Sequence, residues 1–309
     1  MPPPFYSSFF ECNKWSDYIK HHESPVTFSS KENWVILSSI ESEIKRKIEL
    51  RGVPLSQWNI KINYGIKTGY NPAFIIDGKT KANLIQEDPK SAEIIRPILR
   101  GRDIKRYGFD YNNLWLIATF PSLHLNIDRY PAIKSYLLSF GMQRLEQTGK
   151  IYIINGEKIK ARKKTNNKWF ETQDQIAYRD DFSKPKIVYR EISLEMVACF
   201  VEKECFVNNK CYIVTGENLY FLLGFLNSKI FQKTYLKQAN QTGGRGNVFL
   251  KTLCLPKPKI EEEEYLKTLV LQAQSKECFD SERIKSISKI DHFFEEYFGL
   301  TPAEIESLE

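Results

Sequence analysis

The stretch "YGIKTGYNPAFIID", residues 64–77, contains near-matches to two chemical signatures. Adenine amino-methyltransferases use an Asn-Pro-Pro-aromatic loop, in which polar groups bind the amino group of a flipped base and the ring stacks on it. Asn71, Pro72 and Phe74 fit, but Ala73 replaces the second proline and no glycine-rich cofactor loop precedes them. "GIKTG" lacks the GKS/T ending of a phosphate loop. The stretch therefore predicts binding rather than catalysis.

The same residues are suited to hold phosphate. Gly65 and Gly69 flank Lys67 and Thr68. Glycines allow tight turns with exposed backbone N–H groups, and the lysine and threonine add a charge and a hydroxyl. The alternative is a plain strand–turn–strand that binds nothing.

Three further stretches combine basic side chains with aromatic or amide ones: residues 96–109, 158–179 and 240–251. Arginine and lysine pair with phosphates and guanine edges, whereas amides read adenine. The 96–109 stretch alone is better explained as a solvated loop, but the four stretches together favour nucleic acid. The residues expected to contact DNA are Lys67, Thr68, Arg100, Arg102, Lys105, Arg106, Lys160, Arg162, Lys163, Lys164, Asn166, Asn167, Lys168, Trp169, Arg179, Arg190, Arg245 and Asn247.

We find no catalytic or metal-binding constellation to compete with this interpretation. Asp77 and Lys79 lack the upstream acidic partner of a nuclease core, and no histidine lies near a nucleophile pattern. The six cysteines form no CxxC pair and are expected to be reduced, mostly buried thiols in a cytoplasmic protein. We therefore expect no catalytic residue and no metal ligand.

The elements that position these stretches are predicted from apolar spacing and caps. Residues 38–51 form a helix with a capping box between Ser38 and Glu41. Short β-rich runs begin at residue 58 and recur from 150 to 215. A helix with Pro131 in its first turn lies between them. Residues 217–238 form one long apolar helix, and two helices over 261–298 precede a short one capped by Thr301.

The charge distribution separates the body from the end of the chain. The 309 residues carry a net charge of +7, but residues 261–309 have 13 acidic and five basic residues, a net charge of −8. A basic body suggests a polyanion as its partner. We expect the acidic helices to pair and to lean on the 38–51 helix through Lys45, Arg46 and Lys47 or on a partner methyltransferase subunit. Deleting residues 261–309 should leave DNA binding intact while stability or partner association falls. The alternative is a self-contained helical cap.

Taken in order, "YGIKTGYNPAFIID", "IIRPILRGRDIKRY", "KPKIVYREIS", "LLGFLNSKIFQKTYL" and "LPKP" resemble the TaqI-like C-terminal specificity domain. This is the target-recognition domain of type II and IIG restriction-modification enzymes and adenine-specific DNA methyltransferases. The resemblance extends over about residues 34–309, including the lead-in helix and the ending "IDHFFEEYFGLTPAEIESLE". It implies a separate specificity subunit or the C-terminal part of a larger enzyme, because this chain lacks the family's catalytic regions.

Residues and resemblance together predict a mixed α/β (α+β) fold with three segments. A lead-in segment (1–58) with one helix precedes a β-rich recognition domain (59–258) and a C-terminal helical segment (259–309). The predicted function is sequence-specific recognition of double-stranded DNA beside a methyltransferase or nuclease domain or subunit, without membrane contact. S-adenosylmethionine and Mg²⁺ are expected only on that associated region. The alternatives are a fragment of an active methyltransferase or restriction enzyme, and an RNA-binding module.

Overall fold

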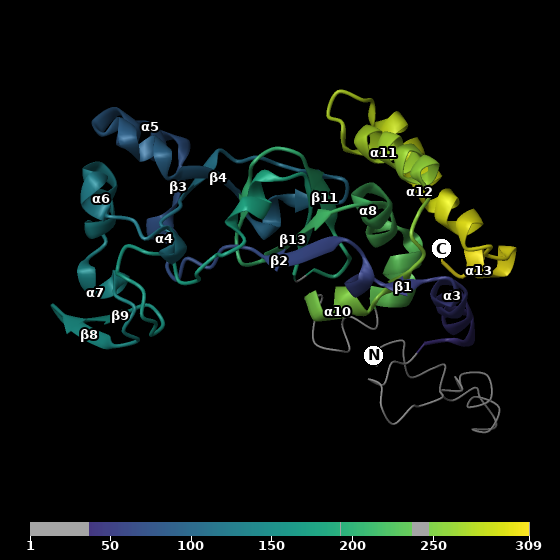
Figure 1. Cartoon of the computed structure of the whole chain (residues 1–309), viewed down its shortest axis with the longest axis horizontal. Coiled ribbons are helices and arrows are strands. Elements are labelled where there is room, and N and C mark those ends of the chain that lie inside the picture. Colours follow the sequence, from purple (N-terminus) through teal and green to yellow (C-terminus); the bar gives the residue numbers. More distant parts are fainter. Residues whose placement is uncertain (1–36, 192, 237–246, 309) are drawn as a thin grey trace, which may run out of the picture.

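The computed structural model describes residues 37–191, 193–236 and 247–308. Figure 1 shows an elongated molecule with a central sheet, helices near both chain termini at one end, and α4–α7 with the β8–β9 hairpin at the other. The fold is mixed α/β, as the sequence predicted. The Arg245 prediction lies outside the described residues.

A four-stranded antiparallel sheet forms the centre of the molecule, in the order β11-β10-β13-β2. Its strands are β2 (Ile60–Tyr64), β10 (Lys186–Arg190), β11 (Ala198–Val201) and β13 (Cys211–Gly216). These strands lie in the runs predicted from the sequence. Their β-branched and aromatic residues suit a pleated sheet that is covered on both faces.

The two faces of the central sheet belong to two different hydrophobic cores. Ile187 and Tyr189 of β10 pack into a core with the terminal helices, whereas Val188 between them packs toward the second sheet. This alternation follows from the period of two along a strand. The first of these cores also contains Ile44 of the lead-in segment and Phe294 of the C-terminal segment, so all three predicted segments contribute to one core. The boundaries between the segments remain predictions.

A second sheet covers the other face, in the order β12-β4-β7-β3. It comprises β3 (Ile75–Asp77), β4 (Ile95–Leu99), β7 (Leu114–Ile117) and β12 (Phe206–Val207). Only the β12–β4 pair is parallel among these described strands. Three two-stranded ribbons complete the strands: β1 (Val53–Pro54) with β14 (Cys254–Leu255), β5 (Ile104–Lys105) with β6 (Gly108–Phe109), and β8 (Ile151–Ile154) with β9 (Glu157–Lys160).

Short helices surround the second sheet: α4 (Asn71–Phe74), α5 (Gly78–Glu87), α6 (Pro131–Leu138) and α7 (Met142–Leu145). Short turns of 3₁₀ helix lie at Leu55–Gln57, Pro89–Glu93, Gly101–Asp103, Pro121–Leu123, Ile127–Arg129 and Arg179–Ser183. The sequence predicted α6, but it predicted a turn where α5 begins. The side chain of Asp77 accepts a hydrogen bond from Thr80 N at 2.7 Å, so it caps a helix instead.

The terminal helices are α3 (Ser39–Leu50), α8 (Leu219–Asn227), α10 (Asn247–Thr252), α11 (Ile260–Gln274), α12 (Asp280–Tyr297) and α13 (Pro302–Glu306). The capping boxes predicted at Ser38 and Thr301 are confirmed. The long helix predicted over residues 217–238 is wrong, because its backbone becomes extended at Ser228. There the hydroxyl accepts a hydrogen bond from Phe231 N, which starts a π-helical turn over Phe231–Tyr235.

The acidic pair α11–α12 packs on α8 rather than on α3, which corrects the sequence prediction. Phe294 of α12 contacts the ring of Phe221 with centroids 5.2 Å apart. Glu263 of α11 accepts hydrogen bonds from Tyr220 N and Phe221 N at the start of α8. Of the three predicted α3 cations, Lys47 pairs at 2.7 Å with Glu304 of α13.

Three carboxamide side chains cover the outer edge of β11. Asn227 accepts from Ala198 N at 3.1 Å and donates to Ala198 O at 2.9 Å. The amides of Gln232 and Gln274 make the same pair of bonds with Met196 and Phe200, at 2.8–3.1 Å. The backbone N–H and C=O groups of these three alternate residues point away from β10. The side-chain amides therefore bond to the groups with which a further strand would otherwise pair.

The cysteines give a direct test of the core. Cys199, Cys205 and Cys211 are buried, whereas Cys254 and Cys278 are partly exposed. Burial raises the pKa of Cys205 and of Cys211 to about 12, which keeps both thiols protonated and unreactive. A thiol reagent at neutral pH is therefore expected to modify Cys254 and Cys278 in the folded chain, and Cys199, Cys205 and Cys211 only in denaturant. Peptide mass spectrometry checks this, and rapid labelling of the three buried thiols would contradict the packing.

Candidate DNA-binding surface

The glycines of the 64–77 stretch are required by backbone packing. A Cβ on Gly65 would lie 2.1 Å from Asn208 O, and the next residue donates from Ile66 N to Val207 O at 2.7 Å. Gly69 has a φ of +82°, a conformation that favours glycine. Thr68 is buried and its hydroxyl donates to Asn71, so only Lys67 of the two predicted contacts is exposed.

The near-match to a methyltransferase loop has no ring available for a base. Ala73 and Phe74 are fully buried in the short helix α4. The guanidinium of Arg162 lies over the Phe74 ring, 5.0 Å from its centroid. A ring enclosed in this way cannot stack on a flipped nucleotide.

Arg162 has an internal role, which corrects its predicted contact with DNA. Its side chain is 4% exposed. The guanidinium donates to the carbonyls of Leu145, Thr68, Glu171 and Trp169 at 2.5–2.9 Å. Burial lowers the pKa of this guanidinium to about 10, so it remains charged at neutral pH. Arg162 therefore joins the 64–77 turn to the 145–171 loop.

Lys67 and Lys163, from the two segments that Arg162 joins, lie near the same carboxyl group. Gln173 N donates to Lys67 O at 3.0 Å, and the charges of Lys67 and Lys163 both act on Asp174. Burial raises the pKa of that carboxyl, and the two lysines oppose the rise. We define the basic surface as Lys67, Lys158, Lys160, Lys163, Lys164 and Lys168, all exposed and without an ion pair within the described residues.

The amide and aromatic predictions in this loop divide into exposed and internal residues. Asn166 is exposed beside the lysines. Asn167 donates to the carbonyls of Thr172 and Gln173, so its side chain holds the loop. Trp169 is half-buried, with its ring against Phe170 at 5.5 Å between centroids. Asn166 is thus the amide available to a base edge.

Most predicted cations of the 96–109 stretch already have partners inside the chain. Arg100 pairs with Asp103 at 2.9 Å, Lys105 with Asp110 at 2.7 Å, and Arg106 with Asp291 of α12 at 3.6 Å. Arg102 is exposed. The stretch therefore connects the second sheet to the terminal helices, and DNA contact by its partnered cations would require those pairs to open.

Arg179 and Arg190 also have local partners. Arg179 is exposed and pairs with Asp180 at 3.3 Å, whereas half-buried Arg190 donates to Ile104 O. Arg245 falls outside the described residues. Asn247 begins α10, and its side chain is likewise outside the described part of the chain.

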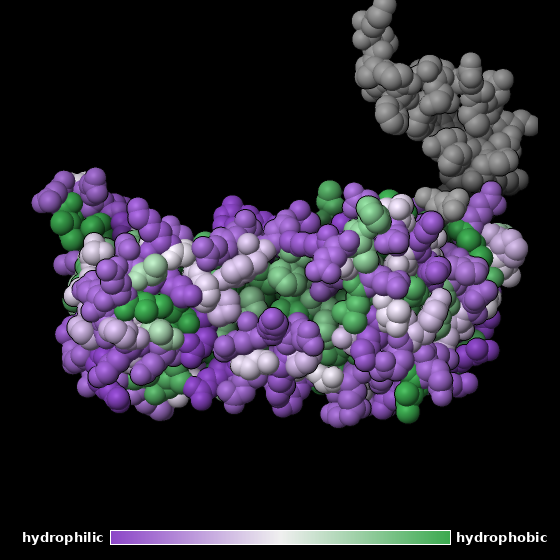
Figure 2. Space-filling model, turned by 90° about the horizontal axis from the view of Figure 1, so that it is seen from above, coloured by the Kyte–Doolittle hydropathy of each residue, from purple (hydrophilic) through white to green (hydrophobic). Residues whose placement is uncertain are grey.

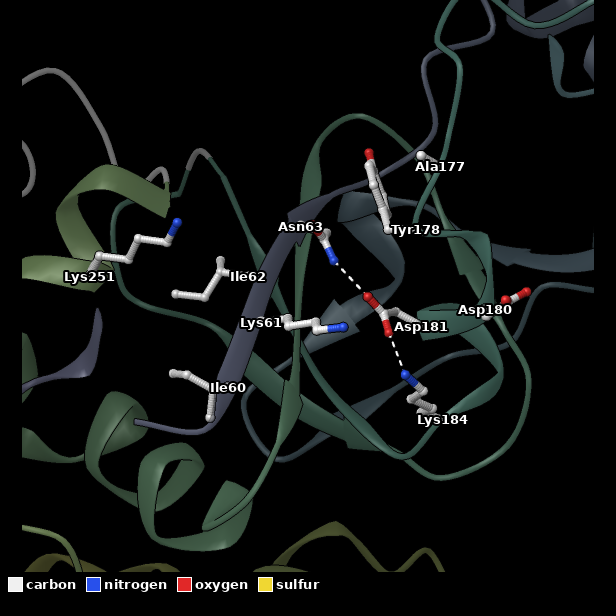
Figure 3. Close-up of a pocket in the computed structure, with 10 residues that line it drawn as sticks. All are labelled: Ile60, Lys61, Ile62, Asn63, Ala177, Tyr178, Asp180, Asp181, Lys184 and Lys251. Atoms are coloured by element: carbon white, nitrogen blue, oxygen red, sulfur yellow. Dashed lines mark hydrogen bonds and ion pairs between the residues drawn. The ribbon is translucent and has the colours of Figure 1, made fainter. Parts of the chain in front are cut away.

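A polar cavity of about 520 Å³ contains lysines that the sequence analysis missed. Figure 3 shows Lys61 and Asn63 extending from β2 toward Asp181, with Ile60 and Ile62 on the other side of the strand. Asn63 and Lys184 donate to Asp181 at 2.9 and 2.7 Å. The alternation of "IKIN" in β2 was the available signal, because it places its polar residues on one face.

The wall of this cavity carries the Tyr178 ring and further charge. Tyr178 donates to Tyr64 O at 3.0 Å, and burial raises its pKa well above the ordinary value. Tyr64 remains 45% exposed. The hydrogen bond to Asp181 raises the pKa of Lys184, and Lys251 of α10 lies on the opposite wall. Lys61 and Lys251 thus bring positive charge to the cavity, while the Asp181 carboxylate already accepts hydrogen bonds from Asn63 and Lys184.

Within the described ranges, no group of three or more His, Cys, Asp or Glu side chains is arranged to hold a metal ion. No helix in the same part of the chain combines the length and apolar character needed to cross a membrane.

Residues 96–255 match the family of TaqI-like C-terminal specificity domains. The match covers more than half of the chain, and the chain belongs to this family. This confirms the predicted resemblance, although the 64–77 stretch lies before the matched range.

Two solved structures are similar to the chain. The type IIL restriction-modification enzyme MmeI in complex with DNA is 14% identical over 82% of this chain and 35% of its own, with a TM-score of 0.47. The type IIG restriction endonuclease BpuSI is 12% identical over 84% of this chain and 32% of its own, with a TM-score of 0.44. The chain thus spans about a third of each. No curated protein matches it.

Proposed function

We propose that this chain recognises double-stranded DNA sequence-specifically, as the specificity module of a restriction-modification system. Its membership of the TaqI-like specificity domains carries this proposal. The basic surface supports it, because its exposed lysines form no ion pair with the described residues and can neutralise phosphates. Lys67 and Lys163 would hold the backbone, and Asn166 would reach a base edge.

The catalytic chemistry would belong to an associated methyltransferase or nuclease domain or subunit. S-adenosylmethionine and Mg²⁺ would bind to that region. The cavity beside Asp181 would contribute to DNA binding through Lys61 and Lys251, whose charges are available at its walls. Thr68, Arg162 and Asn167 would act indirectly, by fixing the loops that carry the exposed lysines.

Binding to labelled duplexes with a randomised centre tests the proposal. We expect selected duplexes to bind roughly 10³-fold or more tightly than random ones. Replacing Lys163 and Lys164 by glutamine should weaken binding to every duplex. It should also reduce the slope of log affinity against log salt concentration by about 1 per lysine.

Lys285 and Lys289 of α12 provide the matched control, because they are exposed lysines on an acidic helix. Their replacement by glutamine should leave affinity and salt slope unchanged. Equal affinity for all duplexes would refute the proposed function, with or without salt dependence. Two further titrations address the alternatives: clear binding of S-adenosylmethionine would favour a methyltransferase, and displacement of duplex DNA by single-stranded RNA would favour an RNA-binding module.

A further inference from the structure

The β8–β9 hairpin is a separate two-stranded ribbon at the end of the molecule away from α3 and α11–α13 (Figure 1). Its strands are joined by Asn155 and Gly156, whose φ values of +50° and +80° suit the tight turn that matches strand twist. Four residue pairs give the ribbon a length of about 13 Å. Among the described strands, these two pair only with each other.

The two faces of this ribbon have different surroundings. Tyr152 and Ile159 are paired on the half-buried face, where the Tyr152 hydroxyl donates to Glu146 at 2.6 Å. The other face carries two cross-strand pairs, Ile151 with Lys160 and Ile153 with Lys158. We call these four side chains the ribbon face. Glu157 pairs with Ile154 and therefore belongs to the half-buried face.

The ribbon face exposes apolar surface where a solvated hairpin would carry polar residues. Ile151 is 53% exposed and Ile153 is 79% exposed. Figure 2 shows apolar side chains among hydrophilic ones at this end of the molecule. The lysines opposite these isoleucines form no ion pair with any other described residue. Exposed apolar side chains of this kind are expected at a binding surface.

Charge indicates which partner the ribbon face fits. Residues 148–168 contain seven basic residues and one acidic residue, Glu157. A two-stranded β-ribbon fits the major groove of B-DNA, which is about 12 Å wide. There, isoleucine can contact thymine methyl groups, while lysine binds guanine acceptors or flanking phosphates. This combination favours duplex DNA over a protein partner.

We propose that the β8–β9 hairpin enters the major groove with the ribbon face toward the bases, Ile151 and Ile153 contacting base edges and Lys158 and Lys160 contacting guanine acceptors or phosphates. The proposal rests on the function proposed above and assigns its base-reading element. It places sequence discrimination on the isoleucine pair, which the sequence analysis did not consider.

The base of the hairpin is fixed firmly enough for this role. Gly149 N donates to Arg162 O at 2.8 Å, and Ala161 N donates to Lys150 O at 2.9 Å. Because the Arg162 side chain also holds the turn that carries Lys67, the ribbon and that lysine are placed relative to each other. Arg162 is therefore a positioning residue for the ribbon.

The test compares two double variants of the full chain, Ile151→Ser/Ile153→Ser and Lys158→Gln/Lys160→Gln. The probes are a duplex selected by the wild type from a randomised pool and a scrambled duplex of equal composition. The isoleucine variant should lose about tenfold or more affinity for the selected duplex only, with its salt slope unchanged. The lysine variant should weaken both complexes and lose about 2 from the salt slope.

Phe279→Ser is the matched control for the isoleucine variant, because Phe279 is 78% exposed and precedes the acidic helix α12. Circular dichroism confirms that each exposed variant remains folded. If the wild type selects a sequence but the hairpin variants bind like the wild type, the hairpin proposal is wrong and the proposed function stands. Equal losses on both duplexes from the isoleucine variant would also overturn base reading. A wild type without sequence preference would refute both proposals.

Discussion

Replacing Arg162 by methionine is expected to lower the free energy of unfolding by about 3–5 kcal/mol. Methionine fills much of the same space but donates no hydrogen bonds. The carbonyls of Leu145, Thr68, Glu171 and Trp169 would then lose the buried guanidinium that donates a hydrogen bond to each of them. Each buried polar group left without a partner costs about 1–3 kcal/mol. Equilibrium denaturation monitored by intrinsic fluorescence measures the change.

Arg162→Lys distinguishes geometry from charge, because lysine keeps the charge but lacks the planar fork. We expect the Arg162→Lys variant to retain only part of the stability that Arg162→Met loses. Lys163→Met is the neighbouring control on the exposed side and should change stability by less than about 0.5 kcal/mol. An Arg162→Met variant as stable as this control would show that water replaces the guanidinium without cost.

Deleting residues 261–309 is expected to prevent folding, whereas the sequence predicted that DNA binding would persist with lower stability or weaker partner association. Leu266, Leu269, Val270 and Phe294 are buried in the core that α8 and the central sheet share. Each fully buried apolar side chain contributes about 1.5–3 kcal/mol. Their combined loss approaches the whole stability of a typical domain, about 5–15 kcal/mol. The truncated chain should show no cooperative transition and should bind a hydrophobic dye.

A point variant keeps this conclusion testable without the deletion. Phe294→Ala should cost about 3–5 kcal/mol, because the ring contacts Phe221 and lies against Gly224 of α8. Lys289→Ala, exposed on the same helix, should be close to neutral. A folded truncation with native-like sequence preference would show that the acidic helices are a separate cap after all.

The sequence correctly predicted the helix ends that are determined by residues within a single helical turn. The capping boxes at Ser38 and Thr301 follow from side chains that hydrogen-bond to nearby backbone, and the Pro131 helix follows from a proline whose fixed φ suits the first helical turn. The break at Ser228 was missed, because apolar periodicity continues across it while the hydroxyl caps a new turn. Asp77 was misread for a similar reason, since aspartate before glycine suits both a turn and a helix cap.

The candidate site was harder to predict, because exposure depends on contacts between distant residues. Nothing near Arg162 in the sequence distinguishes it from Lys163, yet one is buried against Thr68 O and the other faces solvent. Arg106 likewise pairs with Asp291, a partner 185 positions away, which composition cannot reveal. Basic stretches therefore indicated which loops are candidates for DNA contact, but not which of their cations lack an ion pair within the described residues.

The carboxamides along β11 determine how other chains can approach the central sheet. Partners that bind by β-augmentation add a strand to an open edge and need its free N–H and C=O groups. At Met196, Ala198 and Phe200 those groups are already bonded to Gln232, Asn227 and Gln274. Edge-to-edge association of newly made chains, a common route to aggregation, is blocked at this strand for the same reason. Any partner that docks at this strand must therefore do so through side chains, without extending the sheet.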